Sequence, residues 1–546
     1  MIENAKTLGD LLDKAVARWP NREAIVFQGE RICYQEFQEK VEHLSKALLS
    51  IGIRKGDKVS ILFSNRPEWS ISEYAVDKIG AIVVPVNTRY KAHELEYILN
   101  HSDSTTLIMM DQFLGIDYMA MLGEICPEVS KCEPGRFQSS RLPFLKNIIC
   151  LSRQRHPGTY EFYELLELGG QLKNDGELKR AQANVDEEDI AHIPYTSGTT
   201  GFPKGVMTTH YQYLWFNSSF VRNIRLAEDD RLCVPPPFCH NFGNSQGILT
   251  PTLCGCCSVI VEYFDPVLCL ETIERERCTF FAGTPTMYIK MLQHSDFERF
   301  NLASLKLGLI AAAPAPVKLI QDIMDRMGIQ TLIHGYGMTE NSVGTSMTSP
   351  GDSPQIISTT VGKPFPGAQV KVVDTQTGED LSFGKEGELC TKGRLIMKGY
   401  YKMPEELTKL IDKDGWFHTG DLALIDQNGY IKITGRLKDV FMPGGLNVSP
   451  EEVENTLYAH PKVKQASVIG VPDPVMGEVG MAFLELKEGE RATEQEIIEF
   501  CRRKMANFKV PKYVRFTNEF PMTSTGKVQR FKLKERAKQE MALKTS

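Results

Sequence analysis

The sequence predicts an α/β protein, with a large N-terminal domain of parallel-sheet α/β layers and a small α+β C-terminal domain. Helical and strand patterns alternate through the first hundred residues, and the strand runs are apolar throughout, as strands covered on both faces are. A glycine-containing turn near residue 435 then precedes about 110 residues with a new pattern. We therefore expect a second, smaller domain to begin near residue 435.

The N-terminal elements follow from the spacing of apolar residues. Phe37, Val41, Leu44 and Leu48 recur at helical intervals, and a Lys-Gly-Asp turn then leads into an apolar run. The further elements expected are a strand at 59–63, a helix at 67–78, a strand at 81–86, a helix around 95–99 and a strand at 106–109. Residues 127–160 carry scattered Pro, Gly and Ser, which predicts an irregular surface excursion.

The C-terminal elements have the pattern of an α+β module. A helix is expected to begin near Pro450, because proline suits the first turn of a helix and acidic residues follow it. Strands are expected at 465–471 and 482–486, and an amphipathic helix at 493–505.

Composition excludes several classes of protein. Hydrophobic residues make up 42% and charged residues 24% of the 546, which is ordinary for a globular chain and excludes disordered, collagenous and coiled-coil proteins. The apolar runs, such as 79–86, fall short of the roughly 18–20 residues of a membrane-spanning helix. The N-terminus carries an acidic residue early and does not read as a secretory signal, so we expect a cytoplasmic protein.

The cysteines and the basic C-terminal segment can both be interpreted without a metal site or a nucleic-acid partner. The 13 cysteines are odd in number, and the cluster at 254–257 cannot easily close a zinc site, so we expect buried free thiols. Residues 501–546 hold 13 Lys and Arg against 3 Glu, which suits an anionic ligand or a solvated charged face. No nucleic-acid-binding module is evident, so no nucleic acid is expected as a partner.

Residues 195–205 have the composition of a phosphate-binding loop. Three glycines let the backbone approach an anion, the hydroxyls of four serine and threonine residues add donors, and Lys204 adds a charge. Gly205 follows the lysine, so the segment is not a Walker A loop. The alternative, a Gly/Ser/Thr linker, fits poorly with a position directly after the buried strand expected at 190–193.

The loop resembles the phosphate loop of the adenylate-forming superfamily, which includes acyl-CoA synthetases, luciferases and the adenylation domains of peptide synthetases. Further motifs of that family follow in the same order, and the match runs from about residue 7 to 535. They are Gly-Tyr-Gly-Met-Thr-Glu at 335–340, Gly-Glu-Leu at 387–389, Trp-Phe-His-Thr-Gly-Asp at 416–421, Gly-Arg-Leu-Lys-Asp at 435–439 and Pro-Met-Thr-Ser-Thr-Gly-Lys at 521–527.

The resemblance implies a two-step reaction that uses ATP, Mg²⁺ and coenzyme A. A carboxylic acid is first joined to AMP with release of pyrophosphate, and a thiol then displaces the AMP. Carboxylate and phosphate repel each other by about 4 kcal/mol at about 4 Å and an effective dielectric near 20, so a cation must lie between them. In the family the lysine that matches Lys527 bridges the two anions, a role that supplies transition-state stabilisation.

The resemblance also assigns the nucleotide site residue by residue. Glu340 and Thr200 would hold the metal, Thr339 would bond the α-phosphate, Tyr336 would stack on adenine, Asp421 would accept both ribose hydroxyls, and Arg436 would donate to ribose or phosphate. The remaining nucleotide contacts would come from Thr196, Ser197, Gly198, Thr199, Gly201, Lys204, Ala312, Ala313, Pro314, Gly335 and Gly337.

The hinge and the thiol tunnel come from the same resemblance. It implies domains at 1–434 and 439–546 with a hinge at 435–438 between them, so that the small C-terminal domain is mobile. Lys438 occupies the hinge position, where rotation would exchange the face that the small domain presents. Gly444 and Gly445 would line the tunnel for the pantetheine arm, because side chains there would block it. Leu446 departs from the acid or aromatic residue more usual in the family.

The acyl pocket is expected between residues 238–243 and the region of 311–313, Gly335 and Gly337. Peptide-synthetase domains carry an aspartate there to bind an amino group, and this chain has His240, which would act as a gate for the carboxylate or as a hydrogen-bonded core histidine. Acetyl-CoA synthetases have tryptophan at the position of Gly337. Glycine favours a longer or cyclic acid over acetate.

The predicted function is therefore an AMP-forming acyl-CoA synthetase for a medium- or long-chain fatty acid, or for a cyclic or aromatic acid. One alternative is an adenylate-forming enzyme with a different acceptor, such as a carrier-protein ligase or a luciferase. The second is a non-catalytic nucleotide sensor, against which the presence of both Lys527 and Glu340 counts. A C-terminal Lys-Thr-Ser in place of Ser-Lys-Leu slightly favours coenzyme A. Both a monomer and a homodimer remain open.

Overall fold

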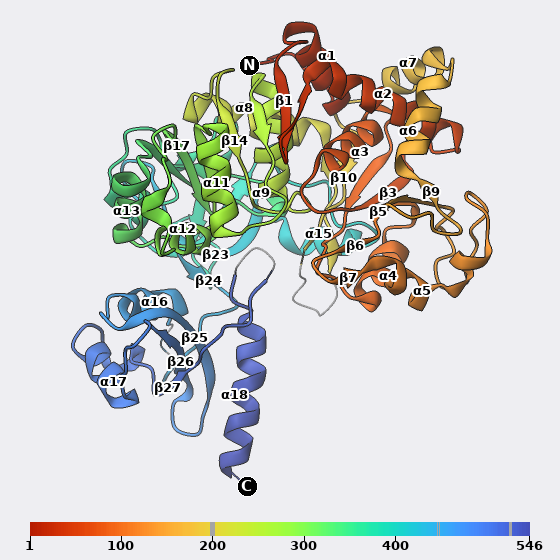
Figure 1. The fold of residues 1–546 in the computed structure, drawn as a ribbon. Helices are drawn as coiled ribbons and strands as arrows, with labels where there is room; N and C mark the ends of the chain where they lie inside the picture. The colour runs from red at the N-terminus through yellow and green to blue at the C-terminus, as the bar shows by residue number, and fades with distance from the viewer. Residues whose placement is uncertain (197–202, 445, 447, 524–526, 546) are drawn as a thin grey trace.

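The computed structural model describes residues 1–196, 203–444, 446, 448–523 and 527–545, and it has a larger and a smaller lobe. The larger lobe holds two sheets of mainly parallel strands with helices around them, and the smaller lobe lies beyond β24 in the chain (Figure 1). This arrangement confirms the predicted fold class of a large α/β domain and a small α+β domain.

One large sheet has a parallel centre and antiparallel edges. Its strand order is β2-β1-β15-β14-β16-β17-β18-β19-β20, and the strands from β1 to β18 in this order are parallel to their neighbours. The strands are β1 (Glu23–Phe27), β2 (Glu30–Cys33), β14 (Arg231–Cys233), β15 (Cys257–Val259), β16 (Phe280–Gly283), β17 (Leu307–Ala311), β18 (Thr331–Tyr336), β19 (Ser346–Met347) and β20 (Lys363–Pro364).

The second large sheet has the order β13-β10-β4-β3-β5-β8-β9, with only the β13–β10 pair antiparallel. Its strands are β3 (Lys58–Leu62), β4 (Ile82–Pro85), β5 (Ser104–Met110), β8 (Asn147–Leu151), β9 (Tyr160–Glu161), β10 (Ile190–His192) and β13 (Thr208–Thr209). Two small hairpins stand apart from it, β6 (Gln112–Phe113) with β7 (Ile116–Asp117), and β11 (Tyr195–Thr196) with β12 (Lys204–Gly205).

Helices separate and cover these sheets. Strand β16 shows the layering, because Phe280 joins the core between the two sheets while Phe281 joins the core on the opposite face. The helices of the larger lobe are α1 (Leu8–Arg18), α2 (Tyr34–Ser50), α3 (Pro67–Lys78), α4 (Ala92–His101), α5 (Tyr118–Ile125), η1 (Pro127–Lys131), α6 (Phe162–Gln171), α7 (Asp175–Ala183), α8 (His210–Ile224), α9 (Asn241–Asn244), η2 (Ser245–Leu249), α10 (Thr250–Cys254), α11 (Pro266–Glu276), α12 (Pro285–Leu292), η3 (Phe297–Arg299), α13 (Val317–Met327), η4 (Thr339–Asn341), α14 (Pro354–Thr359) and α15 (Pro404–Leu410).

A four-stranded antiparallel sheet closes the larger lobe before the chain enters the smaller one. Its strands, in spatial and chain order, are β21 (Gln369–Val373), β22 (Gly387–Lys392), β23 (Phe417–Ile425) and β24 (Ile431–Arg436). Three of the motifs that define the family resemblance begin or lie on β22, β23 and the end of β24. Segments distant in sequence therefore become neighbouring strands.

The smaller lobe is built on a long hairpin, one further strand and four helices among the described residues. Strands β25 (Val463–Asp473) and β26 (Gly477–Leu486) pair antiparallel, and β27 (Tyr513–Phe516) joins β26 in parallel. The helices are α16 (Pro450–Tyr458), α17 (Glu494–Arg502), η5 (Asn507–Lys509) and α18 (Arg530–Thr545), the last of which projects to the C-terminus (Figure 1).

The surface excursion expected at 127–160 is partly wrong. Strand β8 lies inside that range, every one of its residues is buried, and it pairs in parallel with β5 in the second large sheet. The helix expected at 67–78 is confirmed with the same bounds, and α16 begins at Pro450 as expected. All thirteen cysteines are free, and those at 254, 256 and 257 are buried. Among the described residues, the helices are too short or too polar to cross a bilayer.

Candidate active site

Asp421 is a buried carboxylate held between two strands and a tyrosine. Strands β23 and β24 pair so that Asp421 lies opposite Arg436, and Arg436 Nε is 2.7 Å from Asp421 Oδ1. Tyr336, at the end of β18, donates its hydroxyl to Asp421 Oδ2 at 2.6 Å. Asp421 is only 3% exposed. Each carboxylate oxygen still has a second lone pair, so the group can also accept hydrogen bonds from a ligand.

Burial and the neighbouring Asp421 carboxylate raise the pKa of Tyr336 well above its usual value. The phenol therefore remains a donor at neutral pH, and the Tyr336–Asp421–Arg436 group keeps its hydrogen-bonding pattern over the physiological range. These three residues come from β18, β23 and β24, so two different sheets meet at this group.

Lys527 approaches this group from the smaller lobe. It lies in the segment closed by the bridge between Met522 and Val528, directly before Val528, and its backbone N–H donates to Thr523 Oγ1 at 3.0 Å. The residue as a whole is exposed, yet the protein around its ammonium removes enough water to lower the pKa of Lys527, and the charge of Arg436 lowers it further. Asp421 acts in the opposite direction. Lys527 thus lies within electrostatic range of both Arg436 and Asp421.

Arg530 anchors the segment that carries Lys527. Its guanidinium lies 2.9 Å from Asp439, 2.6 Å from Glu451 and, through two bonds, 2.9 and 3.0 Å from Glu454. The Arg530 side chain is 20% exposed and that of Glu454 12%. One terminal nitrogen of the guanidinium donates to both oxygens of Glu454 and the other donates to Asp439 and Glu451, so charge-assisted bonds to three carboxylates fix its orientation. The anchor therefore joins α18, α16 and the chain just beyond the expected hinge.

Glu340 and Lys204 form a second polar group through Tyr400. The Tyr400 hydroxyl donates to Glu340 Oε1 at 2.9 Å, and Lys204 Nζ lies 5.1 Å from the centre of the Tyr400 ring. Lys204 also pairs with Glu406 at 2.5 Å, and its hydrogen bond lowers the pKa of that carboxyl to about 2. Strand β12 supplies the lysine, and the turn η4 supplies the glutamate. Glu340 offers hard carboxylate oxygens of the kind that bind Mg²⁺.

His240 is a neutral imidazole at physiological pH. Burial lowers its pKa to about 4, and Lys527 adds to that effect. Its Nε2 lies 3.2 Å from Asn87 Nδ2. An amide nitrogen only donates, so Nε2 accepts and the ring proton is on Nδ1. His240 precedes the first turn of α9, and its electrostatic link to Lys527 places it on the side of the larger lobe that faces the smaller one.

The glycines of the expected pocket differ in what surrounds them. A Cβ on Gly337 would come 2.0 Å from Val343 O and 2.4 Å from Gly344 Cα, so the residue is fixed by close backbone packing. The expectation that glycine leaves the pocket open at this position therefore lacks support from its surroundings. A Cβ on Gly335 would meet its nearest atom at 3.5 Å, an ordinary contact. Ala312 adopts φ 75°, a left-handed conformation in which glycine is more usual.

Other expected site residues have these positions. Thr196 is on β11 opposite Lys204, Thr339 begins η4, and Ala313 and Pro314 follow β17. Lys438 lies in the turn after β24, where burial and Arg436 lower its pKa. Gly444 adopts φ 59° and packs against Met476 of the smaller lobe. Ser197, Gly198, Thr199, Thr200, Gly201 and Gly445 fall outside the described residues.

Sequence reasoning missed four residues of this region. Asn87, Tyr400 and Glu406 contact His240, Glu340 and Lys204, while Arg530 fixes the Lys527 segment. Tyr400 and Glu406 lie about 60 residues beyond the Glu340 motif, and no local pattern marks them. Arg530 could have been noticed as a basic residue three positions after Lys527, but its acidic partners are 76 to 91 residues away.

A two-lobed α/β fold that brings a clamped carboxylate, an arginine and a lysine from the second lobe together is that of the adenylate-forming enzymes. The chain belongs to the AMP-binding enzyme family: the model of the AMP-binding enzyme matches residues 12–401, and that of its C-terminal domain matches 452–527. The predicted family is therefore confirmed.

Two curated relatives match along nearly the whole chain. The putative acyl-CoA synthetase YngI of Bacillus subtilis is 40% identical over 542 residues, which cover 99% of this chain and 98% of the relative. The medium-chain acyl-CoA ligase ACSF2, mitochondrial, of Homo sapiens is 36% identical over 549 residues, with 99% and 89% covered.

Solved structures show the same fold. The anthranilate CoA ligase AuaEII in complex with anthranoyl-AMP has a TM-score of 0.88 at 29% identity, with 99% of each chain covered. ATP-bound MatB from Rhodopseudomonas palustris has a TM-score of 0.81 at 26% identity, with 97% of this chain and 99% of MatB covered.

Proposed function

We propose that the protein is an AMP-forming acyl-CoA synthetase that acts on a medium- or long-chain fatty acid or on a cyclic or aromatic acid. The observation that carries the proposal is the approach of Lys527 to the Tyr336–Asp421–Arg436 group. A nucleotide sensor needs a carboxylate for the ribose, but it has no need of a cation positioned from a second lobe. The names of the curated relatives support transfer to coenzyme A.

In the first step the acid attacks the α-phosphate of ATP, and pyrophosphate leaves. Asp421 would accept the ribose hydroxyls through its unused lone pairs, while Arg436 and Thr339 would donate to ribose or phosphate oxygens. Lys527 would lie between the two anions and offset both their repulsion and the charge that develops on phosphorus. Tyr336 would give the adenine a flat face.

Glu340 and Thr200 are the residues proposed to hold Mg²⁺. The carboxylate of Glu340 fits the metal, because only Oε1 is bonded to Tyr400 among its described contacts and its oxygens are hard donors. When bound, the ion would neutralise charge on the phosphates. Lys204, held by Glu406 and Tyr400, would add a second positive charge on the phosphate side.

The second step would need the smaller lobe to turn. Rotation at 435–438 would withdraw Lys527 and bring Gly444 and Gly445 to the pantetheine arm of coenzyme A. The left-handed φ of 59° at Gly444 fits a position that needs a backbone without a side chain. In this scheme domains 1–434 and 439–546 each stay rigid.

The substrate class rests on His240 and on the relatives. A neutral His240 can face a carboxylate as a hydrogen-bond donor through Nδ1–H without competing with Lys527 for its charge. No aspartate occupies the segment 238–243, which argues against an amino acid. The relatives include a medium-chain ligase and an anthranilate ligase, and both classes fall within the proposal. We further propose that the enzyme is cytoplasmic. Its assembly is either a monomer or a homodimer.

AMP release measured over a panel of acids tests the proposal. Acetate, hexanoate, dodecanoate, benzoate and cyclohexanecarboxylate would each be supplied with ATP and Mg²⁺, with and without coenzyme A. We expect AMP that requires both a larger acid and coenzyme A and that disappears in Lys527→Ala. Adenylate formed with no effect of coenzyme A would contradict the proposed acceptor, and ATP binding without turnover on any acid would favour a sensor.

A further inference from the structure

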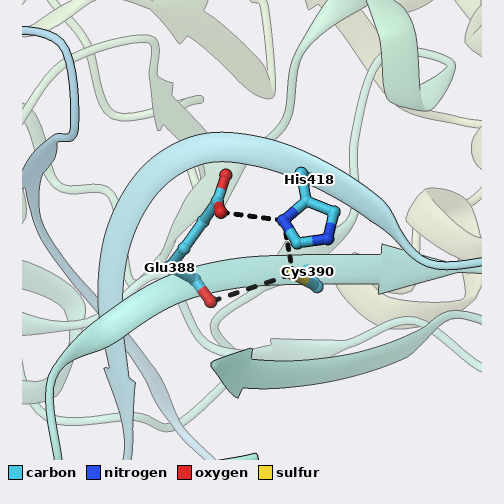
Figure 2. Close-up of side chains that lie close together, drawn as sticks. All are labelled: Glu388, Cys390 and His418. Atoms are coloured by element: carbon cyan, nitrogen blue, oxygen red, sulfur yellow. Dashed lines mark hydrogen bonds and ion pairs between the residues drawn. The ribbon is translucent and has the colours of Figure 1, made fainter. Parts of the chain in front are cut away.

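Glu388, Cys390 and His418 form a compact cluster that the proposed reaction does not use. Cys390 on β22 and His418 on β23 are register partners, and Glu388 lies two residues before the cysteine on the same face of the sheet. His418 Nδ1 is 2.8 Å from Glu388 Oε2 and 3.5 Å from Cys390 Sγ (Figure 2). The sequence motifs contain Glu388 and His418, but no role was assigned to either residue.

The spacing of the three donor atoms suits a transition metal. One atom from each residue lies within 4.8 Å of the others. Zinc bonds of about 2.3 Å to sulfur and about 2.0–2.2 Å to nitrogen and oxygen, in tetrahedral geometry, place donor atoms roughly 3.3–3.6 Å apart. The Nδ1–Sγ distance of 3.5 Å already meets this requirement, and the hydrogen-bonded Nδ1–Oε2 pair at 2.8 Å needs only a small separation.

Asp412 lies close to the outer nitrogen of His418, where a small approach would give the hydrogen-bonded outer partner that such sites use. Its Oδ2 is 3.8 Å from His418 Nε2, and its Oδ1 accepts N–H bonds from Asp414 and Trp416, both at 2.9 Å. In the metal-free protein the 2.8 Å contact with Glu388 Oε2 keeps the ring proton on Nδ1. A metal bound at Nδ1 would replace that proton, and the ring proton would then be on Nε2, which faces Asp412. Nδ1 is the nitrogen that faces Glu388 and Cys390.

The cluster can exchange a metal with solvent. Cys390 is buried, but the side chains of His418 and Glu388 are 30% and 12% exposed, so a fourth position can be taken by water. The other described cluster, Glu73, Asp77 and His192, has side chains no more than 1% exposed and offers no such access.

We propose that Glu388, Cys390 and His418 bind one zinc ion that stabilises the β22–β23 pair and is separate from the metal of the nucleotide site. On binding, Cys390 loses its thiol proton to solvent, and His418 gives up the proton on Nδ1 and takes one from solvent on Nε2. Zn²⁺, one thiolate, one carboxylate and a neutral imidazole then form a site without net charge. Glu388 Oε1 accepts the Gly420 N–H at 3.0 Å, so the ion would also tighten the turn that leads to Asp421. It takes no part in the reaction.

Cobalt titration of the full chain without nucleotide tests the proposal. Co²⁺ in a zinc site with a thiolate ligand gives a near-ultraviolet charge-transfer band. We expect this band at one equivalent, its loss when Zn²⁺ is added, and its absence in Cys390→Ala. The matched control is Cys501→Ala, which removes a buried free thiol of the smaller lobe and should leave the band intact. Zn²⁺ should raise the unfolding temperature of the wild type and of this control, but not of Cys390→Ala.

Asp412→Asn gives a second measurement that keeps all three ligands. The asparagine Oδ1 can still accept both N–H bonds, while Nδ2 would face His418 in place of the carboxylate oxygen. Loss of such an outer partner costs about 10–100-fold in metal affinity. The same variant decides the matter if Cys390→Ala fails to fold. Equal bands in Cys390→Ala and Cys501→Ala, the absence of a thiolate band in the wild type, or an unchanged affinity in Asp412→Asn would overturn the proposal.

Discussion

The two halves of the proposed site are built in opposite ways. Asp421 is 3% exposed, sits within a sheet, and has both oxygens bonded to residues of the larger lobe. Lys527 is exposed, sits on a short bridged segment, and is fixed indirectly through Arg530. The half of the site around Asp421 is thus organised before a ligand arrives. The position of the ammonium of Lys527 depends instead on the position of the whole smaller lobe. We infer that ATP affinity depends on the first half and the chemical rate on the second.

Lys527→Ala should have the largest effect and should confine it to the rate. Removing the cation that offsets transition-state charge costs about 10²–10³-fold in kcat for adenylation. Pyrophosphate exchange would measure this, and KM for ATP should change little because the Asp421 half is intact. A large increase in that KM with a preserved kcat would contradict the division between the halves.

Asp421→Asn should show the complementary effect. Charge-assisted hydrogen bonds are worth about 1.5–3 kcal/mol, so KM for ATP should rise about 10–100-fold. The amide retains the shape of the carboxylate and one acceptor for Tyr336. Equilibrium binding of ATP to the variant, compared with Lys527→Ala, would show whether affinity depends on this half.

Arg530→Met tests whether the anchor positions Lys527. We expect kcat to fall by about tenfold with KM for ATP unchanged, because the cation loses its fixed placement. The single variant should also be destabilised, since Glu454 is left without its partner beside Glu451.

The double variant Arg530→Met/Glu454→Gln separates these two effects. It should recover part of the stability in a denaturant titration, because Glu454, the least exposed of the three carboxylates that Arg530 pairs with, is then neutral as well. The value of kcat should stay low. Recovery of kcat together with stability would make Arg530 a structural residue only.

The smallest effect concerns pH. The pKa of Lys527 lies below its usual value, so its charged form persists below that pKa and is lost as pH rises through it. Adenylation should therefore decline at a lower pH than a free lysine would give. His240, with a pKa of about 4, should add no change near pH 6.5. A pH profile of kcat/KM with Lys527→Arg as control, whose alkaline decline should disappear, checks both statements.

Much of the fold could be predicted because its elements carry local signals. Helix α3 begins at Pro67, which marks the first turn, and ends at Lys78 before a Gly-containing strand entry, as expected. Strand β8 was missed because its apolar run of four residues, 148–151, is short and follows a segment rich in turn-forming residues. Only its pairing with β5 identifies it as part of the sheet. The β21–β24 sheet was missed because its pairing joins segments whose partners cannot be identified from spacing.

The candidate site shows the same limit. Motifs identified Lys527, Asp421 and Arg436, and the structure brings them within electrostatic range of one another. Arg530 was not predicted because its role depends on ion pairs with three carboxylates that are distant in sequence. Gly337 was interpreted as a residue that leaves space in the acyl pocket. In the structure, the Val343 carbonyl lies where its Cβ would be, so close backbone packing accounts for the glycine. Sequence spacing identifies residues with chemistry of their own more readily than residues that act through a partner.

The acidic partners of Arg530 all lie on the same side of the expected hinge as Lys527 itself. Asp439, Glu451 and Glu454 belong to the smaller lobe, and so does the segment from Met522 to Val528. Lys527 therefore moves with the smaller lobe as one rigid body, at a constant distance from the turn at 437–439. The rotation angle of the smaller lobe alone would then decide whether the ammonium of Lys527 reaches the nucleotide. No change of conformation within the Lys527 segment would be needed.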